Sequence, residues 1–208
     1  MPGGPRTVVV ATGNQGKLTE IRSALAVPGW SFAAAADLGR WPEVEETGET
    51  FLDNALIKAR AAVGLFGLAA LADDSGLEVD SLGGAPGVGS RRYAGDGATD
   101  ADNNAKLLEA LRGIHDAGRS ARFRCVIVLV DTDGLVTTAE GACEGRIGAV
   151  AAGDGGFGYD PLFLPNAAPG RTMAQLSLAE KNAISHRGAA LRALRAILAD
   201  VSGRGAAW

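Results

Sequence analysis

The sequence predicts an α/β fold in which helices flank a mixed β-sheet. Short β-branched runs alternate along the chain with segments of helical periodicity, as in α/β proteins. Two of the strand-like runs are separated by an Asp133-Gly134 turn that is typical of a hairpin, so the sheet cannot be wholly parallel. We see no internal repeat and no long linker in the 208 residues. We therefore expect one domain over residues 1–208, with mobile ends at 1–6 and 202–208.

The first 66 residues are expected to form one strand and two helices. A β-branched strand at 8–11 leads into a helix with an apolar stripe of Leu18, Ile21 and Leu25, which Pro28-Gly29 closes. A second helix is expected from Thr50 to Phe66. Its predicted inward face consists of Leu52, Ala55, Leu56, Ala59, Val63 and Phe66. Asn54 and Lys58 are four residues apart, so they project from one side of this helix.

The chain from residue 69 onwards alternates between strands and capped helices. An apolar strand at 69–72 is expected to present Asp73-Asp74-Ser75-Gly76 at its end, before a Gly/Pro loop at 83–97. Thr99 followed by Asp102 predicts an N-terminal cap for a helix at 101–111. The remaining predicted elements are strands at 122–130 and through 138, a Gly-rich turn at 153–161 before 162–164, a capping box of Ser177 and Glu180, and a helix at 189–201.

Charge and hydropathy argue against two classes of partner. A net charge of −4 and a pI of about 5.2 are unlike those of proteins that bind nucleic acid through its phosphates. No run reaches the roughly 18 apolar residues of a membrane span, and the N-terminus has no signal-peptide core. We expect a cytoplasmic protein with no nucleic-acid or membrane partner. Cys125 and Cys143 are expected to be buried, reduced thiols; a disulfide or a cysteine nucleophile is the alternative.

Lysine is scarce in this chain. Of the 20 basic residues, 16 are Arg and only 4 are Lys, namely Lys17, Lys58, Lys106 and Lys181. An ammonium is a compact point charge, whereas the guanidinium of Arg is a planar fork. We therefore expect Lys where a compact charge must reach a phosphate, and chance placement in helices is the alternative.

The segment Thr12-Gly13-Asn14-Gln15-Gly16-Lys17 has the composition of a phosphate-binding turn. Small residues let the backbone approach an anion, the following helix offers free N–H groups, and Lys17 adds a full charge. It is not a Walker A loop, because its two glycines are three residues apart and Leu18 replaces the Ser or Thr that holds magnesium. The alternative is a plain strand-to-helix turn with a solvated Lys17.

Acidic residues gather at two places that suit magnesium. Glu43, Glu45 and Glu46 precede one helix, and Asp73-Asp74 follows a buried strand. Magnesium takes one or two protein carboxylates, keeps several waters and binds substrate phosphates. A solvated acidic loop is the alternative for the glutamates. Neighbouring side chains on an extended chain point opposite ways, so we expect only one of the two aspartates to face a metal.

Two further segments have the chemistry of a base pocket. Gly155-Gly156-Phe157-Gly158-Tyr159-Asp160-Pro161 places two aromatic rings and a carboxylate in a Gly-rich stretch, where a ring could stack on a flat base. Ser185-His186-Arg187-Gly188 offers donors to a purine carbonyl. Core aromatics that anchor a loop, and a structural His, are the alternatives.

Seven ordered segments resemble the inosine triphosphatase family, the RdgB-like noncanonical purine nucleoside-triphosphate pyrophosphatases. They are 12–17; 45–48 with Thr50-Phe51 and Asn54-Ala55; Lys58-Ala59-Arg60; 72–77; 84–87; 156–161; and 180–188. The resemblance implies an elongated mixed sheet flanked by helices, two lobes around one cleft, and a homodimer. It also implies Mg²⁺-dependent hydrolysis of ITP, dITP and XTP to the monophosphate and pyrophosphate, which removes deaminated purines from the nucleotide pool.

The resemblance also implies roles for individual residues. Thr12, Gly13, Asn14, Gln15, Gly16 and Lys17 would bind the triphosphate, and Ser75 would contact the substrate. Catalysis would depend on Asp74, Glu46 and Lys58, and the metal would be held by Glu45 or Glu46 together with Asp74. The base-side and other substrate contacts would be Phe157, Gly158, Tyr159, Asp160, Lys181, His186 and Arg187. Three of the four lysines thus fall in the substrate segments.

The chemistry of these residues supports a hydrolytic mechanism. Asp74, with Glu46, would orient or deprotonate a water that attacks the α-phosphorus, while the lysines and loop N–H groups balance the charge. Donors at His186 or Arg187 would favour a purine carbonyl over the amino group of adenine, so we expect ITP and XTP to be hydrolysed far faster than GTP and ATP. The rivals are a pyrophosphatase for another modified nucleotide and a catalytically silent nucleotide sensor. Close carboxylates argue against the sensor, because they repel a triphosphate that lacks a metal.

Overall fold

The computed structural model describes residues 6–39, 41–42 and 44–203. In these ranges it has one six-stranded sheet with the order β2-β1-β3-β4-β5-β6. The strands are β1 (Arg6–Val10), β2 (Trp30–Ala34), β3 (Ala69–Val79), β4 (Ser120–Val130), β5 (Val136–Ile147) and β6 (Phe163–Pro165). The helices are α1 (Gln15–Ala24), α2 (Ala35–Leu38), α3 (Phe51–Phe66), α4 (Asp100–Ala110), α5 (Leu178–Ile184) and α6 (His186–Gly203), with short 3₁₀ turns at Asp80–Leu82, Gly87–Arg92, Asp116–Gly118 and Met173–Gln175.

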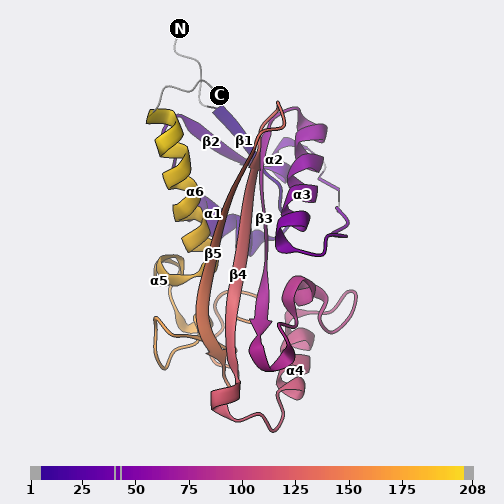
Figure 1. Cartoon of the computed structure of the whole chain (residues 1–208), viewed down its shortest axis with the longest axis vertical. Coiled ribbons are helices and arrows are strands. Elements are labelled where there is room, and N and C mark those ends of the chain that lie inside the picture. The colour runs from indigo at the N-terminus through magenta and orange to yellow at the C-terminus, as the bar shows by residue number, and fades with distance from the viewer. Residues whose placement is uncertain (1–5, 40, 43, 204–208) are drawn as a thin grey trace. The chain divides into compact units, whose positions relative to one another are not determined.

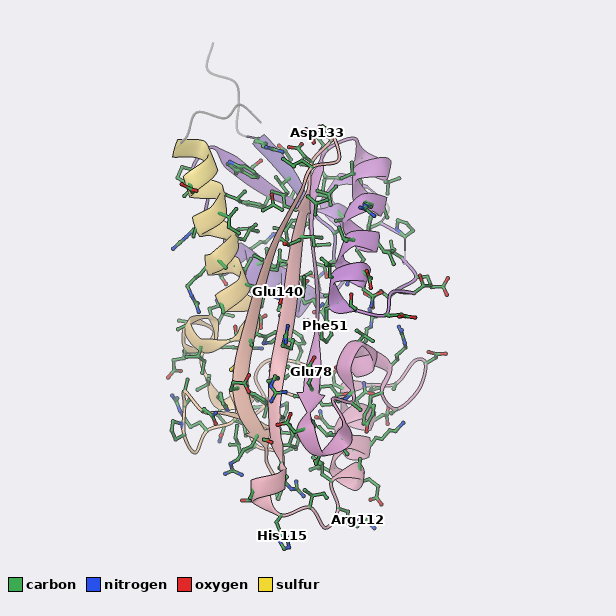
Figure 2. The ribbon with its side chains drawn as sticks, viewed as in Figure 1. Phe51, Glu78, Arg112, His115, Asp133 and Glu140 are labelled. Atoms are coloured by element: carbon green, nitrogen blue, oxygen red, sulfur yellow. The ribbon has the colours of Figure 1, made fainter. Side chains whose placement is uncertain are left out.

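The sheet is mixed, which confirms the predicted fold class. Strand β1 pairs in parallel with β2 on one side and with β3 on the other. Strand β6 pairs antiparallel with β5. The turn between β4 and β5 has Asp133 at its tip (Figure 2), where the Asp133-Gly134 pair predicts it.

The chain divides into two compact units. Unit 1 comprises residues 1–74, 125–141 and 187–208, and unit 2 comprises 75–124 and 142–186. The single domain and the cleft that the resemblance implies stay predictions. None of the helices in the described ranges is long and apolar enough to cross a membrane.

Each unit has its own apolar core. In unit 1, Val8 and Ile127 of the sheet pack with Ile21 of α1 and with Leu191 and Leu194 of α6. Helices α6 and α3 lie on opposite sides of the strands of this unit (Figure 1). In unit 2, the core joins strands β3, β4 and β5 with helix α4, and its members are Leu77, Val79, Leu107, Leu111, Ala121, Phe123, Cys143, Ile147, Tyr159, Leu162, Phe163 and Met173.

Helix α3 buries a different face from the predicted one. Its buried residues are Phe51, Asn54, Ala55, Lys58, Ala59 and Ala62. Leu52, which was expected to point inward, is exposed, and Leu56, Val63 and Phe66 are only half-buried. The difference arises because Asn54 and Lys58 are turned inward to meet a carboxylate, and small alanines beside them allow the helix to approach the sheet. The apolar periodicity alone therefore misplaced the buried face by part of a turn.

Other boundaries differ in informative ways. Strand β3 continues to Val79, so Asp73 and Asp74 lie within a strand rather than after its end. Strand β2 and the short helix α2 were not predicted, since Trp30–Ala34 shows only weak alternation and is half-buried for most of its length. Of the ends expected to be mobile, 1–5 and 204–208 lie outside the described residues. Arg6 begins β1, and α6 runs to Gly203.

Three helix starts agree with their sequence signals. Thr50, Thr99 and Ser177 each cap a helix in a complete capping box, with Asp53, Asp102 and Glu180 respectively as the returning acid. Cys125 and Cys143 are buried free cysteines, as predicted.

Candidate active site

The turn between β1 and α1 is built by its own side chains. The hydroxyl of Thr12 accepts the N–H of Asn14 at 3.1 Å, and the side chain of Asn14 caps α1 by accepting the N–H of Lys17 at 3.0 Å. This cap holds Lys17 in the first helical turn, with Gln15 and Gly16 before it. The Lys17 ammonium lies 3.1 Å from the Asp73 carboxylate and is mostly buried, which excludes the alternative of a solvated side chain.

Asp73 belongs to a buried network of alternating charges. Its Oδ2 accepts from Nη2 of Arg187 at 2.8 Å and from Nε of Arg187 at 3.2 Å. The other side of the guanidinium donates through Nη1 to Glu20 of α1. Two carboxylates, Glu20 and Asp73, thus balance two cations, Lys17 and Arg187, and all four belong to unit 1. Balanced pairing of this kind is what allows charged groups to be buried.

The network gives Arg187 a structural role that the sequence did not predict. The resemblance implies a donor to the substrate, but the Arg187 side chain is 0% exposed and its guanidinium is used by two carboxylates. The physical reason is that Glu20 and Asp73 are both buried and need a cation between them. Arg187 therefore has a structural role in this network, and its contact with the substrate stays a prediction.

A second charge cluster surrounds Asp74. The Lys58 ammonium lies 2.7 Å from Oε1 of Glu46 and 3.2 Å from Oδ1 of Asp74. Oδ2 of Asp74 accepts from the side-chain amide of Asn54 at 3.4 Å. Because Asn54 and Lys58 are four residues apart on α3, one helix face presents both donors to the same carboxylate. The loop that carries Glu46 and the strand that carries Asp74 are therefore joined through α3.

The acidic loop approaches α3 closely at Gly48. The backbone N–H of Gly48 donates to the side-chain oxygen of Asn54 at 2.7 Å. A Cβ at this position would lie 2.5 Å from Cβ of Asp53 and 2.7 Å from Oδ1 of Asn54. Only glycine fits here without a shift of the helix start, so Gly48 sets the approach of the Glu46 loop.

Glu45 and Glu46 are neighbours in this loop, but their side chains point to opposite sides of the extended chain. Burial alternates from Val44 to Gly48, with Glu46 half-buried at the cluster and Glu45 exposed. The Lys58 ammonium contacts both Glu46 and Asp74, and the charge of Glu46 acts on the Asp74 carboxylate. Of the two predicted alternatives, the structure therefore brings Glu46 rather than Glu45 to the aspartate, because neighbours on an extended chain point opposite ways.

The two adjacent aspartates differ in their electrostatics. Burial raises the pKa of Asp74 above its ordinary value, although the charges of Lys58 and Lys17 act in the opposite direction. Burial also opposes ionisation of Asp73, but the charges of Arg187 and Lys17 outweigh it and hold the pKa of Asp73 well below its usual range. Asp73 is therefore a permanent anion of the network, and Asp74 is a more basic carboxylate. This separation supports the expectation that only one of them faces a ligand.

The charges of Asp73 and Asp74 also shift the pKa values of Lys58 and Cys125. Burial lowers the pKa of Lys58, but the carboxylates of Asp74, Asp73 and Glu46 prevail and raise it, so its ammonium is kept charged. Burial, helped by the charge of Asp73, raises the pKa of Cys125 to about 12. A thiol with so high a pKa is a poor nucleophile, which argues against the cysteine alternative.

In unit 2, the Gly-rich turn is closed by a buried ion pair. Lys181 of α5 donates to Oδ2 of Asp160, and the same oxygen accepts the N–H of Phe157 at 2.9 Å. The Lys181 ammonium lies 4.6 Å from the centroid of the Phe157 ring. Gly156 has φ +74°, and a Cβ there would lie 2.1 Å from Oδ2 of Asp160. Glycine is therefore required at this position for the turn to close on the carboxylate.

The other predicted base-side residues of unit 2 are buried among aromatic rings. His186 stacks on Phe123 with centroids 4.8 Å apart and planes 17° apart. Tyr159 is a core residue whose hydroxyl donates to the carbonyl of Ser90 at 2.8 Å. These contacts support the alternative of a core aromatic that anchors the loop, and a contact of Tyr159 with the substrate stays a prediction. Ser75 lies within β3 and is half-buried.

Comparison with known proteins decides the family. The Ham1 family model matches residues 8–197. The chain belongs to the Ham1 family. A dITP/XTP pyrophosphatase of Desulforamulus reducens is 50% identical over 192 residues, covering 92% of this chain and 94% of the relative. A dITP/XTP pyrophosphatase of Salmonella paratyphi A is 50% identical over 189 residues, covering 90% and 95%.

Solved structures of Ham1 proteins share the fold. A HAM1 protein from Coxiella burnetii has a TM-score of 0.84 and 45% identity, covering 94% of this chain and 99% of that chain. The resemblance drawn from the sequence segments is thereby confirmed at the level of the family and of the fold.

In this Ham1 protein, the contacts that the sequence did not predict are the ion pairs of Arg187 with Glu20 and Asp73. Glu20 lies three residues after Lys17 on α1, a spacing that places both on one helix face and could have indicated a shared target. Asp73 could be recognised as buried, but its pairing with Arg187 joins positions 114 residues apart in the chain. Local spacing carries no signal for such a contact.

Proposed function

We propose that this chain hydrolyses noncanonical purine nucleoside triphosphates, such as ITP, dITP and XTP, to the nucleoside monophosphate and pyrophosphate. The observation that carries the proposal is the cluster in which Glu46 and Asp74 share the ammonium of Lys58, beside the Lys17 turn of the same unit. Such a set of carboxylates and cations suits phosphoryl transfer to water. The names of the relatives, dITP/XTP pyrophosphatases, support the substrate class.

The donor set near Asp74 fits magnesium. Oxygens of Glu46 and Asp74 converge on one positive charge, the ammonium of Lys58. Carboxylate oxygens are the ligands of Mg²⁺, which needs only one or two of them. The described residues contain no group of three or more His, Cys, Asp or Glu able to hold a metal, so substrate phosphates and water would have to complete the coordination. When bound, Mg²⁺ would lower the pKa of a bound water and neutralise phosphate charge.

The residues of unit 1 have distinct proposed roles. Asp74, whose pKa burial raises, would orient the attacking water and accept its proton. Lys58 and Lys17 would face the phosphates, and the Thr12–Lys17 turn would offer backbone N–H groups at the start of α1. The water would attack the α-phosphorus, and pyrophosphate would leave.

Residues of unit 2 would recognise the base. The ring of Phe157, held beside Lys181 and Asp160, offers a flat apolar surface on which a purine could stack. A donor such as the His186 imidazole would favour the carbonyl of hypoxanthine or xanthine over the amino group of adenine. We also propose a homodimer, which the family resemblance supports, and a cytoplasmic location, which the two buried free thiols support.

One incubation tests the proposed function. The full chain is incubated with Mg²⁺ and separately with ITP, XTP, dITP, GTP and ATP, and pyrophosphate is resolved from orthophosphate. We expect pyrophosphate from ITP, XTP and dITP at rates far above those for GTP and ATP. Release of orthophosphate alone would mean attack at the γ-phosphorus, and no release from any substrate would favour a nucleotide sensor. Equal rates for all five would contradict the proposed selectivity.

A further inference from the structure

Helix α4 holds both backbone polar groups of Gly158. Oδ2 of Asp100 accepts the N–H of Gly158 at 2.6 Å, and Nδ2 of Asn104 donates to the C=O of Gly158 at 2.9 Å. Asp100 and Asn104 are four residues apart, so they lie one above the other on a single helix face. Gly158 is the residue directly after Phe157, at the centre of the turn closed by Asp160 and Lys181.

Asp100 and Asn104, which we call the Gly158 clamp, lie on a helix whose position is fixed by other contacts. The capping box of Thr99 and Asp102 defines the start of α4, and Asn103 and Leu107 are buried along its inner face. The side chain of Asn103 holds the segment before α4 by accepting the N–H of Ala94 and donating to the C=O of Arg91. The two clamp residues therefore project from a helix that is anchored independently of the Gly158 turn.

Two features indicate that the clamp matters for the shape of the turn. Gly158 has φ +62°, a left-handed conformation that glycine leaves easily, so external bonds are needed to hold it. Oδ1 of Asn104 is buried without a hydrogen-bond partner, which is costly in a folded protein. Because the Asn104 side chain is held with its oxygen unsatisfied, we infer that the hydrogen bond donated by its Nδ2 to Gly158 is required.

The clamp also limits what the turn can offer to a ligand. A carboxylate accepts the N–H of Phe157 and another accepts the N–H of Gly158. These two N–H groups are thus used within the protein, so a ligand at this turn would have to be recognised by side chains such as the half-buried Phe157.

We propose that Asp100 and Asn104 are positioning residues that set the orientation of the Phe157 ring for the purine base. The inference rests on the proposed function, because it takes Phe157 as the base-stacking ring. Neither residue touches the substrate in this account. They act through the two backbone groups of Gly158.

Three variants test the inference in the full chain. Asn104→Ala removes the donor to Gly158 and also the unsatisfied oxygen, so the protein is expected to fold. Asp100→Ala removes the acceptor, whereas Asp100→Asn keeps an amide oxygen that can still accept the N–H. For Asn104→Ala and Asp100→Ala we expect the KM for ITP to rise about tenfold, as for one lost hydrogen bond, with kcat within about twofold. Asp100→Asn is expected to restore a KM near that of the wild type.

A control separates positioning from helix stability. Asp102→Ala breaks the capping box on the same helix, and its carboxylate bonds to Thr99 rather than to Gly158. It is expected to lower the Tm while leaving the KM for ITP within about twofold of the wild type. Hydrogen exchange of the 153–161 peptide gives a readout without substrate, and we expect faster exchange in Asn104→Ala than in Asp102→Ala.

The outcomes distinguish this inference from the proposed function. An unchanged KM in both Asn104→Ala and Asp100→Ala, or an equal rise in Asp102→Ala, would overturn the clamp while wild-type hydrolysis of ITP stands. Unchanged exchange in the 153–161 peptide of Asn104→Ala would also overturn it. A wild-type chain that releases pyrophosphate from none of the noncanonical nucleotides would instead overturn the proposed function, and the role in substrate positioning with it.

Discussion

The aspartates at positions 73 and 74 show how a single step along a strand separates two roles. Asp73 points into the network of Arg187 and Lys17, which keeps it ionised, while Asp74 meets Lys58 and has a raised pKa. A carboxylate of raised pKa accepts a proton more readily near neutral pH. We therefore propose that Asp74, and not Asp73, accepts the proton of the attacking water.

Substitution of Asp74 tests this assignment. Asp74→Asn keeps the shape of the side chain but cannot accept a proton, so we expect turnover of ITP to fall on the order of 10²-fold or more. The measurement is the rate of pyrophosphate release at saturating ITP. The matched control is Asp37→Asn, an exposed aspartate of α2 that pairs with Arg22, and it should retain wild-type turnover. Near wild-type turnover in Asp74→Asn would remove Asp74 from the chemistry.

Glu20 is expected to matter for stability. Its side chain is buried against Arg187, so Glu20→Gln leaves an unbalanced cation in the core of unit 1. Removing one partner of a buried pair costs about 3 kcal/mol of unfolding free energy, which urea denaturation can measure. The exposed Glu109, which pairs with Arg112 on the surface, gives the comparison, and Glu109→Gln should change this free energy by less than about 0.5 kcal/mol. Equal stability of both variants would contradict the charge-balance account.

Individual residues were predictable when their chemistry was local. Lys17, Lys58 and Asp74 are recognisable from the turn, the helical spacing and the buried strand that carry them. The structural role of Arg187 could not be predicted, because its contact with Glu20 joins positions 167 residues apart and depends on tertiary packing. The same long-range packing decides that Tyr159 is a core residue.

At the scale of elements, capping signals were more reliable than apolar periodicity. Capping boxes depend on four consecutive residues, so the starts of α4 and α5 follow from the sequence, and the box of Thr50 and Asp53 at the start of α3 has the same local form. The buried face of α3 depends on the partners of Asn54 and Lys58 in other segments, so periodicity alone misplaced it. Strand β2 lies at the edge of the sheet beside β1, and because most of its residues are half-buried, its sequence shows little alternation of apolar and polar residues.

The capping box of α5 predicts a pH dependence of stability. The backbone N–H and hydroxyl of Ser177 and the guanidinium of Arg171 stabilise the ionised Glu180 and lower its pKa to about 2. A lowered folded-state pKa contributes stability above the ordinary value of 4.5, and this contribution is lost as the pH falls toward about 2.

Glu180→Gln tests the sign of this effect. The variant keeps an acceptor oxygen but has no charge, so its Tm should lie roughly 1–3 °C below that of the wild type at pH 7. Scanning calorimetry between pH 7 and pH 2 should show the difference shrinking below pH 4.5 and vanishing near pH 2. A difference that is constant with pH would contradict the role of the charge.

At the scale of the whole molecule, the scarcity of lysine acquires a structural meaning. Lys17, Lys58 and Lys181 are each buried or mostly buried and each contacts an aspartate, whereas Lys106 lies at the exposed surface of α4. In a chain with 16 arginines, these three positions keep the compact cation. We expect a planar guanidinium at these positions to displace neighbouring side chains.

Four single substitutions test this pattern together. Lys17→Arg, Lys58→Arg and Lys181→Arg are each expected to lower kcat/KM for ITP by about tenfold or more, because the longer fork disturbs a buried contact. Lys106→Arg serves as the matched control and should stay within about twofold of the wild type. Similar kcat/KM values for all four variants would mean that the placement of lysine is chance.

Hydrolysis of ITP in ¹⁸O-labelled water with Mg²⁺ tests the central claim most directly. If water attacks the α-phosphorus, mass spectrometry should find one ¹⁸O in the inosine monophosphate and none in the pyrophosphate. Label in the pyrophosphate, or release of labelled orthophosphate with a nucleoside diphosphate, would contradict the account.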